Sequence, residues 1–495
     1  FGAKNMADST FNFTLNSFPP VVPNREEFTK FEDLYAGRTI GSPNNILVPN
    51  PDLTEIVNQN QKEIAKVRSN LTADIANSIA SLVVGDGVEV NTNNTDIDLI
   101  LETTGFDNTV LTIAETASVY GGAYIKANYT PSLSPVPTFT VLPPTNTAPL
   151  FREGVLLSVS FWDTIRIDGN TIYRWVEHRD NVTRTLTNSL YKGSVSTWGD
   201  KVSLDAIPET NGLPESQKYP AGVARLVWYV PNLLPNRLHP TSSQGRSDFS
   251  GSQSLLASAD LLYTSLIRDF RLGPARAYVP VGALTRTNNS GSYFETDREI
   301  FTELDIDPSS ESGKITLLQG NIRSDEHISS IENLVARIVS AAGLSPVSFG
   351  IGDLGSAQSG TALRVREGKT ISTINAKRRY MAPVLVDIVQ CLASLEGKTV
   401  TDVSVDFPPV RTETGSELAT MLRDLATSGI ISTEEAVRQL HPHWTETQIQ
   451  DEVAQIQETI ASKQPVTPST ASSNLMPMDN PTPDVQTPTD TPTTL

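Results

Sequence analysis

Apolar residues recur at helical spacing in two early segments of the chain. In the first, they return every three or four positions, at Ile64, Val67, Leu71, Ile75, Ile79 and Leu82. This spacing places them on one face of an amphipathic helix, which Gly85 ends. A second, weaker pattern extends from about Asp96 to Tyr120 and stops at Gly121-Gly122. We predict one helix over each segment.

The pattern changes to that of strands between Ala123 and about Val230. Three runs there are rich in β-branched and aromatic residues: Val155–Ser160, Thr164–Ile167 and Ile172–Val176. Asp168-Gly169-Asn170 separates two of these runs and is typical of a tight hairpin turn. The first half of the chain therefore predicts an α+β arrangement, with helices before the sheet.

Two further helices flank a weakly apolar insert. The first has apolar residues at Leu255, Leu256, Ala259, Leu262, Leu266 and Phe270 and is closed by Gly273-Pro274. The second begins at a Ser324 cap, with Asp325 and Glu326 in its first turn, and ends at Gly343. The apolar stripes alone fit an ordinary intramolecular hairpin equally well. The insert favours a stalk with a knob at its end, because about fifty weakly apolar residues make a poor independent core.

The last third of the chain begins with a Gly/Ser-rich segment, Leu344–Gly360, whose single charge is Asp353. A long helix is predicted from about Gly360 to Leu395, with a kink at Pro383. A strand at Val403–Phe407 and two or three helices between Thr412 and Lys463 follow. One of these helices begins with the capping box Ser432-Thr433-Glu434-Glu435. From Pro465 onward, prolines and threonines predict disorder.

The net charge restricts the classes of function, and the length indicates the number of structural units. The 495 residues include 38 Lys and Arg against 56 Asp and Glu, a formal net charge of −18. Tight DNA binding needs cations that displace counterions, so the negative charge argues against a sequence-specific DNA-binding protein. An acidic surface that lets DNA slide past without sticking is compatible with this charge. The length predicts roughly two to four structural units.

Membrane insertion and secretion are not indicated. No apolar run approaches the roughly 18 residues that a membrane span needs, and Phe1–Pro20 lacks the pattern of a signal peptide. Cys391 is the single cysteine, which excludes an intrachain disulfide and a cysteine-based zinc site. Because it falls in an apolar helical pattern, we predict a buried, inert thiol.

Catalytic motifs are also missing. Glu367-Gly368-Lys369-Thr370 ends like a phosphate-binding loop, but Leu363 stands where the first glycine is required, and the segment falls inside a helical pattern. We therefore predict no nucleotide binding. Among five histidines, only His441-Pro442-His443 resembles a metal pair, and a loop between helices explains it better. We predict no catalytic residues, no metal and no cofactor.

Three segments, in this order and spacing, carry a resemblance to a known family. They are Pro235-Asn236-Arg237 with Gly245-Arg246-Ser247-Asp248-Phe249-Ser250-Gly251, then Arg268-Asp269-Phe270-Arg271-Leu272-Gly273-Pro274-Ala275-Arg276, then Ser359-Gly360-Thr361-Ala362-Leu363-Arg364-Val365-Arg366-Glu367. The chain resembles the portal proteins of tailed double-stranded DNA bacteriophages over roughly Asn45–Gln464, most strongly over Pro235–Leu395. The resemblance implies a mixed α+β portal fold with a wing, a helical stem, a clip, a tunnel loop, a long kinked helix and a helical crown.

The resemblance assigns each part of that fold to a segment. The parts are the N-terminal region and wing (Phe1–Gly251), the stem helices (Ser252–Gly273 and Ser324–Gly343), the small β-containing clip (Pro274–Arg323), the tunnel loop (Leu344–Thr361), the long kinked helix and a wing strand (Ala362–Arg411), the crown (Thr412–Gln464) and a disordered tail (Pro465–Leu495).

The resemblance also implies a function without catalysis. Portal proteins form a ring, usually of about twelve subunits, at one capsid vertex, through which double-stranded DNA is packaged and ejected. The implied partners are the DNA, the major capsid and scaffold proteins, the terminase large subunit, which uses the ATP, and a head-completion or adaptor protein. The implied location is the virion, with assembly in the host cytoplasm and no membrane.

Candidate contacts fall in three places. In the predicted tunnel loop, Asp353, Gly355, Ser356 and Gln358 would meet passing DNA sterically, because the segment has no Lys or Arg to anchor phosphates. A surface linker is the alternative. Two basic clusters, Arg268, Arg271 and Arg276 at the stem–clip junction and Lys377, Arg378 and Arg379 in the long helix, could touch phosphate or a partner. Ion pairs between subunits explain these clusters at least as well.

Two other classes of function remain open. Asn- and Thr-rich strands before Pro235 would suit a β-rich surface adhesion module, which predicts a monomer or trimer and a leader peptide. A hydrolase has only diffuse Asp and Glu residues to support it.

Overall fold

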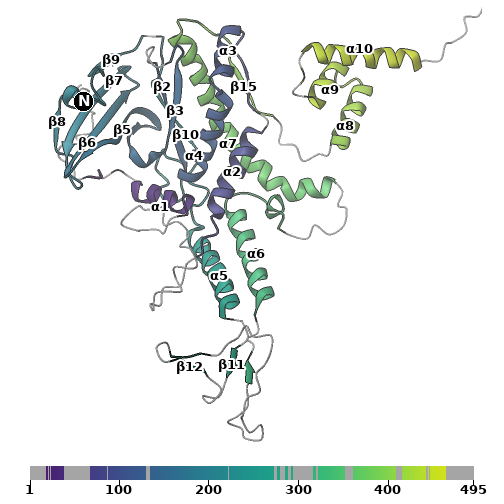
Figure 1. Cartoon of the computed structure of the whole chain (residues 1–495). Helices are drawn as coiled ribbons and strands as arrows, with labels where there is room; N and C mark the ends of the chain where they lie inside the picture. Colours follow the sequence, from purple (N-terminus) through teal and green to yellow (C-terminus); the bar gives the residue numbers. More distant parts are fainter. Residues whose placement is uncertain are drawn as a thin grey trace, which may run out of the picture. The chain divides into compact units, whose positions relative to one another are not determined.

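The computed structural model (Figure 1) describes residues 18–20, 22, 24–37, 67–85, 87–129, 134–220, 222–272, 276–278, 285–287, 291–293, 316–318, 322–351, 360–408, 415–441, 444 and 446–463. The chain divides into two compact units, Phe1–Thr412 and Glu413–Leu495. Helices and strands are mixed in the first unit, as predicted, and the described part of the second is helical.

In the described residues, four helices precede the two larger sheets: α1 Arg25–Tyr35, α2 Leu71–Val84, α3 Thr95–Thr103 and α4 Phe106–Tyr120. The predicted helix end at Gly85 is confirmed. The weaker pattern was wrong as a single helix, because it forms both α3 and α4. Gly105 separates them with a φ of 63°, a left-handed conformation that an α-helix cannot continue through.

An antiparallel sheet of six strands has the order β4-β5-β6-β7-β8, with β9 also paired to β7. Its strands are β4 Thr147–Arg152, β5 Val155–Asp168, β6 Thr171–Asp180, β7 Thr185–Gly193, β8 Asp200–Val202 and β9 Ser216–Lys218. The predicted hairpin is confirmed, since Asp168 pairs with Thr171 across Gly169 and Asn170. Gly169 has the positive φ, 60°, that such a turn requires.

The two runs predicted as separate strands on either side of Asp163 are one strand, β5. Its register against β6 shifts between Thr164 and Arg166. A register shift of this kind bends a strand without ending it. The residues between the two predicted runs, Phe161 to Asp163, pair regularly with β6, so the break in the sequence pattern is not a loop. The third predicted run lies within β6.

Two smaller sheets connect distant parts of the first unit. The order β10-β2-β3 joins Val227–Pro231, Gly122–Asn128 and Thr138–Leu142, and β1 Glu89–Asn91 pairs antiparallel with β15 Ser404–Asp406. The strand predicted around Val403–Phe407 is therefore confirmed as β15. Short 3-10 turns, η3 Pro144–Asn146 and η4 Leu204–Ala206, lie between strands.

Helices α5 Gln253–Leu272 and α6 Ser324–Ala341 lie side by side (Figure 1) and confirm the two predicted stalk helices. The described residues between them include two antiparallel pairs, β11 Arg276–Tyr278 with β14 Thr316–Leu318 and β12 Thr285–Thr287 with β13 Gly291–Tyr293. The predicted Ser324 cap was wrong by one residue. Arg323 occupies the N-cap position without a side-chain cap, and Ser324 is already helical.

Helix α7, Gly360–Leu395, follows the 3-10 turn η7 Pro346–Phe349 and has the bounds predicted from the sequence. Pro383 lies inside it, at the position of the predicted kink. The main hydrophobic core joins α7 to α2, α4 and β2, through fully buried residues such as Ile75, Ile113, Ile125 and Leu385. The same core includes the first turns of α5 and the last turns of α6.

The described part of the second unit has three helices, α8 Gly415–Thr427, α9 Thr433–Leu440 and α10 Glu446–Lys463. Each contributes one buried apolar side chain, namely Leu422, Val437 and Ile449. The predicted cap of α9 is confirmed, because the Ser432 side chain accepts a hydrogen bond from the Glu435 backbone N–H at 3.1 Å. The tail predicted to be disordered, from Pro465, lies outside the described residues.

Candidate functional site

The α5–α6 hairpin is anchored in the core at one end only. At the beginning of α5, Leu256 and Ala259 are buried, and at the end of α6, Ile338 and Val339 are fully buried. Farther along, Leu261, Phe270 and Ile328 are 65%, 49% and 47% exposed. We call this part, residues 261–272 of α5 and 324–331 of α6, the outer half of the hairpin.

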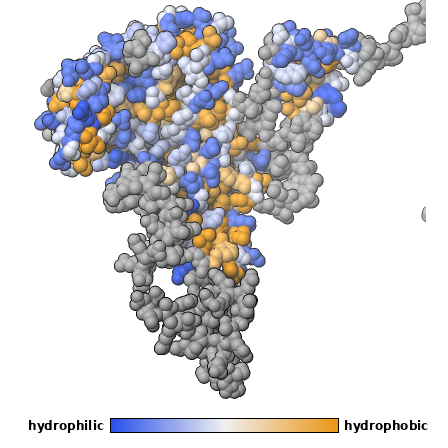
Figure 2. Space-filling model, in the orientation of Figure 1, coloured by the Kyte–Doolittle hydropathy of each residue, from blue (hydrophilic) through white to orange (hydrophobic). Residues whose placement is uncertain are grey.

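Figure 2 shows apolar surface gathered over the hairpin. A buried large apolar side chain stabilises by about 1.5–3 kcal/mol relative to an exposed one. Single exposed apolar residues are common, but several on one two-helix element mark a surface that meets another molecule.

An ionic cluster joins the two helices in the outer half. The Asp269 carboxylate accepts a hydrogen bond from Arg323 Nη2 at 3.0 Å, and His327 Nε2 lies 3.1 Å from the same oxygen. These bonds, the one from Arg323 foremost, lower the pKa of Asp269. Asp269 was missed in the sequence because its partners lie more than fifty residues away, beyond the insert.

The stem–clip basic cluster can be followed only in part. Arg268 is exposed in α5, next to the ionic cluster. Arg271 is in the last turn of α5 and Arg276 is in β11, but their side chains lie outside the described part. Their contact with DNA or a partner stays a prediction.

The four tunnel-loop candidates, Asp353, Gly355, Ser356 and Gln358, lie outside the described residues. Their roles stay predictions. The structure does describe both flanks of the segment, namely η7 with Gly350 and Ile351 before it and α7 after it.

The long-helix basic cluster is mostly internal. Lys377 is 4% exposed, and its Nζ donates to Asp248 Oδ2 at 2.6 Å and to Asn232 Oδ1. Asp248 also accepts from Ser118 Oγ at 2.6 Å and from Asn232 Nδ2 at 3.0 Å. Burial lowers the pKa of Lys377, and the nearby Asp248 opposes this shift. This network ties α7 to α4 and to the segment just before α5.

Arg378 is also buried and binds backbone carbonyls. Its Nε donates to Val83 O at 2.8 Å and Nη2 donates to Leu82 O at 3.1 Å, so it satisfies carbonyls at the end of α2. A third bond, from Nη1 to Pro408 O, is 2.5 Å long. Burial lowers the pKa of Arg378 to about 10, so the side chain keeps its charge at neutral pH.

Two of the three candidate contacts in the long helix are therefore already occupied within the chain. Lys377 and Arg378 bind groups inside their own chain and cannot reach a phosphate without unfolding this part of the core. Of the three, Arg379 alone is exposed. A run of three cations normally indicates a solvated face, and the burial of two of them could not be predicted without their distant partners.

The segment that ends like a phosphate-binding loop, Glu367–Thr370, is helical throughout, as predicted. Its side chains hold other parts of the chain. Lys369 Nζ donates to Ser340 Oγ at 2.7 Å, and Thr370 Oγ1 accepts from Ser345 N at 2.8 Å. A helical backbone offers no cradle of free N–H groups here, so the geometry does not suit nucleotide phosphates.

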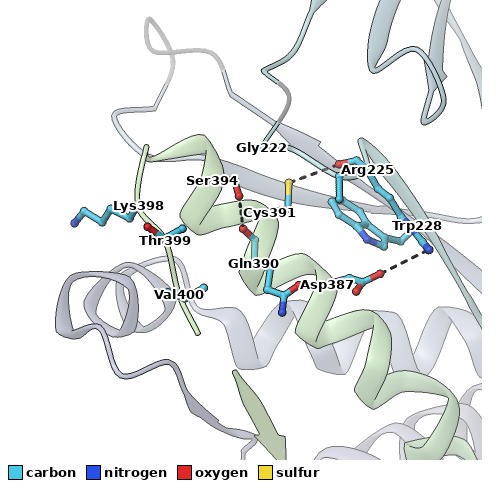
Figure 3. Close-up of a pocket in the computed structure, with 11 residues that line it drawn as sticks. Gly222, Arg225, Trp228, Asp387, Gln390, Cys391, Ser394, Lys398, Thr399 and Val400 are labelled. Atoms are coloured by element: carbon cyan, nitrogen blue, oxygen red, sulfur yellow. Dashed lines mark hydrogen bonds and ion pairs between the residues drawn. The ribbon is translucent and has the colours of Figure 1, made fainter. Parts of the chain in front are cut away.

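Figure 3 shows a pocket of about 300 Å³ between α7 and the segment that leads into β10. It is lined by Gly222, Ala224, Arg225, Trp228, Asp387, Gln390, Cys391, Ser394, Lys398, Thr399 and Val400. Arg225 Nη1 lies 3.6 Å from Asp387 Oδ2 across it. Burial raises the pKa of the Cys391 thiol to about 12, so it stays protonated at neutral pH and is a poor nucleophile. The predicted buried thiol is confirmed.

The described residues contain no group of His, Cys, Asp and Glu side chains that could hold a metal ion. His441 stacks on the Trp444 ring, with centroids 3.8 Å apart, in the connection between α9 and α10. Pro442 and His443 lie outside the described residues. Of the helices that the structure describes, none is both long and apolar enough to cross a membrane.

Comparison with known proteins identifies relatives for most of the chain. The family described as "Phage portal protein, SPP1 Gp6-like" matches residues 23–466. Similar solved structures include a chain of the "Virion of native gene transfer agent (GTA) particle", at 13% identity and a TM-score of 0.39, covering 75% of this chain and 89% of that one. A chain of the "Neck of native GTA particle computed with C12 symmetry" has 14% identity, a TM-score of 0.40 and the same coverage. No curated protein matches the chain.

Proposed function

Because the chain belongs to the SPP1 Gp6-like family of phage portal proteins, we propose that it forms a closed ring at one capsid vertex, through which double-stranded DNA is packaged and later ejected. The exposed apolar surface on the outer half of the α5–α6 hairpin is the observation that supports ring formation most directly. In a ring each copy of the hairpin packs against the next, so this surface is buried by neighbouring subunits.

The segments take the roles that the family resemblance implies. Helices α5 and α6 are the stem, residues 274–323 the clip, residues 344–361 the tunnel loop and α8–α10 the crown. The remainder of the first unit, with its six-stranded sheet and main core, is the wing. The clip meets the terminase motor during packaging and then a head-completion protein, while capsid and scaffold proteins surround the wing.

Charge supports a conduit through which DNA slides. The net charge of −18 disfavours tight binding of phosphates, and the two long-helix cations Lys377 and Arg378 are already bound within the chain. DNA can then pass without a tight contact at each step. The protein acts without catalysis, and a separate terminase subunit uses the ATP.

Replacing Asp353 and Ser356 together with lysine tests the tunnel-loop assignment. Asp353→Lys with Ser356→Lys places cations where DNA passes, and we expect DNA packaging in an in vitro assay to slow or stall. The control variant carries Asp200→Lys and Ser196→Lys, which make the same charge change at exposed positions in β8 and in the connection from β7 to β8. Packaging at the wild-type rate by the tunnel-loop variant would contradict the assignment.

A further inference from the structure

The face of α7 that packs into the molecule changes character along the helix. In its C-terminal half the buried residues are apolar, such as Met381, Leu385 and Ile388. In its N-terminal half, Thr370 and Lys377 are buried on the same face, because seven residues make nearly two helical turns. Thr373 lies between them. Ile374, also on this face, is fully buried in the main core. A packed helix face is normally apolar, so the buried Thr370 and Lys377 need specific partners.

The two threonines bind the backbone that follows α6. Thr370 Oγ1 accepts from the Ser345 N–H at 2.8 Å and lies 3.3 Å from Ser348 Oγ. Thr373 Oγ1 donates to Gly343 O at 2.7 Å. Thr370 and Ser345 are 4% and 5% exposed, so water cannot replace the bond between them.

The contact at Gly343 is close enough to restrict the sequence there. Gly343 has a φ of 91°, and a Cβ at this position would lie 2.7 Å from Thr373 Oγ1. A side chain would therefore be strained by the backbone and would collide with the threonine. The absence of a side chain is what lets α7 approach the end of α6 so closely.

The same face also holds the beginning of α5. Lys377 binds Asp248, which lies five residues before Gln253, the first residue of that helix. One face of α7 thus fastens both helices of the hairpin at their core end, α6 through the threonines and the approach to α5 through the lysine. The threonines also join η7 to α7, the two elements that flank residues 352–359.

We propose that Thr370 and Thr373 are positioning residues for DNA passage: their hydroxyls fix the end of α6 and η7 to α7, and so set where the stem stands on the long helix. This inference rests on the proposed portal function. The role belongs to the hydroxyl groups and not to the bulk of the side chains, which makes it separable from ordinary packing.

Three variants distinguish the effect of the threonine hydroxyls from the effect of side-chain packing. Thr370→Val with Thr373→Val keeps the shape and loses both hydroxyls, while Thr370→Ser with Thr373→Ser keeps both. Ser372→Val is the control, because it puts the same β-branched residue at an exposed position of the same helix. Each variant is compared with wild type for ring mass, for DNA packaged in vitro and for hydrogen exchange at the Ser345 amide.

We expect the valine pair to form rings of wild-type mass, to exchange the Ser345 amide faster by about tenfold or more, and to package DNA several-fold more slowly. The serine pair should restore both properties, and Ser372→Val should match wild type. If the valine pair does not assemble, Thr370→Val alone carries the same test.

Two results would overturn the inference while leaving the portal function standing. One is wild-type packaging by the valine pair despite faster exchange at Ser345. The other is a serine pair that packages as slowly as the valine pair, since the hydroxyls would then not be responsible. Wild-type rings that package no DNA would instead overturn the proposed function, and this inference with it.

Discussion

The two ends of the α5–α6 hairpin have similar apolar patterns but opposite surroundings. Near the core, Ile338 and Val339 are fully buried against α7 and its neighbours. In the outer half, Leu261 and Phe270 are half-exposed or more. The contrast separates a part of the chain that is complete by itself from a part that is completed, in our account, by neighbouring subunits.

Lys377→Met should produce the largest loss of stability, because it breaks the complete part at its buried ion pair. Removing one partner of a buried pair leaves an uncompensated charge, here on Asp248, and costs about 3–5 kcal/mol. Chemical denaturation of the purified protein, followed by near-ultraviolet circular dichroism, measures this change.

The neighbouring Arg379→Met is the matched control, since Arg379 is exposed on the same helix and we expect a change within about 0.5 kcal/mol. Adding Asp248→Leu to Lys377→Met should recover part of the loss, because it removes the orphaned charge. Equal stability of the Lys377 and Arg379 variants would show that the buried pair does not hold the core.

Ile338→Ala and Leu261→Ala compare the two ends of the hairpin directly. The first creates a cavity in the core and should cost about 2–5 kcal/mol of unfolding free energy. The second removes an exposed side chain and should change the stability of the isolated chain by about 0.5 kcal/mol or less. It should instead weaken ring assembly, which the mass distribution at decreasing protein concentration reports. A ring as stable as wild type in Leu261→Ala would argue that this surface is not an interface.

Cys391 offers the smallest and least invasive test. Its buried thiol has a pKa raised to about 12, so we expect almost no reaction with iodoacetamide at pH 8 in the folded protein and complete reaction in denaturant. Mass spectrometry counts the added label. Rapid labelling of the folded protein would mean that the α7 face around Cys391 opens to solvent, and would contradict a core that is complete in one chain.

Local signals in the sequence predict most helices and the sheet region. Glycines and prolines mark the ends of α2 and α5, and β-branched runs with a tight turn mark β5 and β6. The wrongly predicted boundaries come from features that the spacing of apolar residues does not indicate. Gly105 lies inside an apolar pattern that continues on both sides, so the break between α3 and α4 was missed. Asp163 is polar and interrupts the run of β-branched residues, so the single strand β5 looked like two strands, although Asp163 pairs with Trp175 of β6.

The candidate site was less predictable because it depends on distant pairs. Lys377 belongs to a run of three cations, which is typical of a solvated surface, and Asp248, its partner, is 129 residues away. Asp269 similarly meets His327 across the insert between α5 and α6. No sequence motif indicates the contacts of the Thr370 and Thr373 hydroxyls, because these contacts are mainly with backbone groups.

The mass and shape of the purified particle test the central proposal most directly. Native mass spectrometry with negative-stain imaging should show rings of about twelve copies of the 53.7 kDa chain, with a central hole wide enough for duplex DNA. A compact dimer or trimer without a channel would contradict the account.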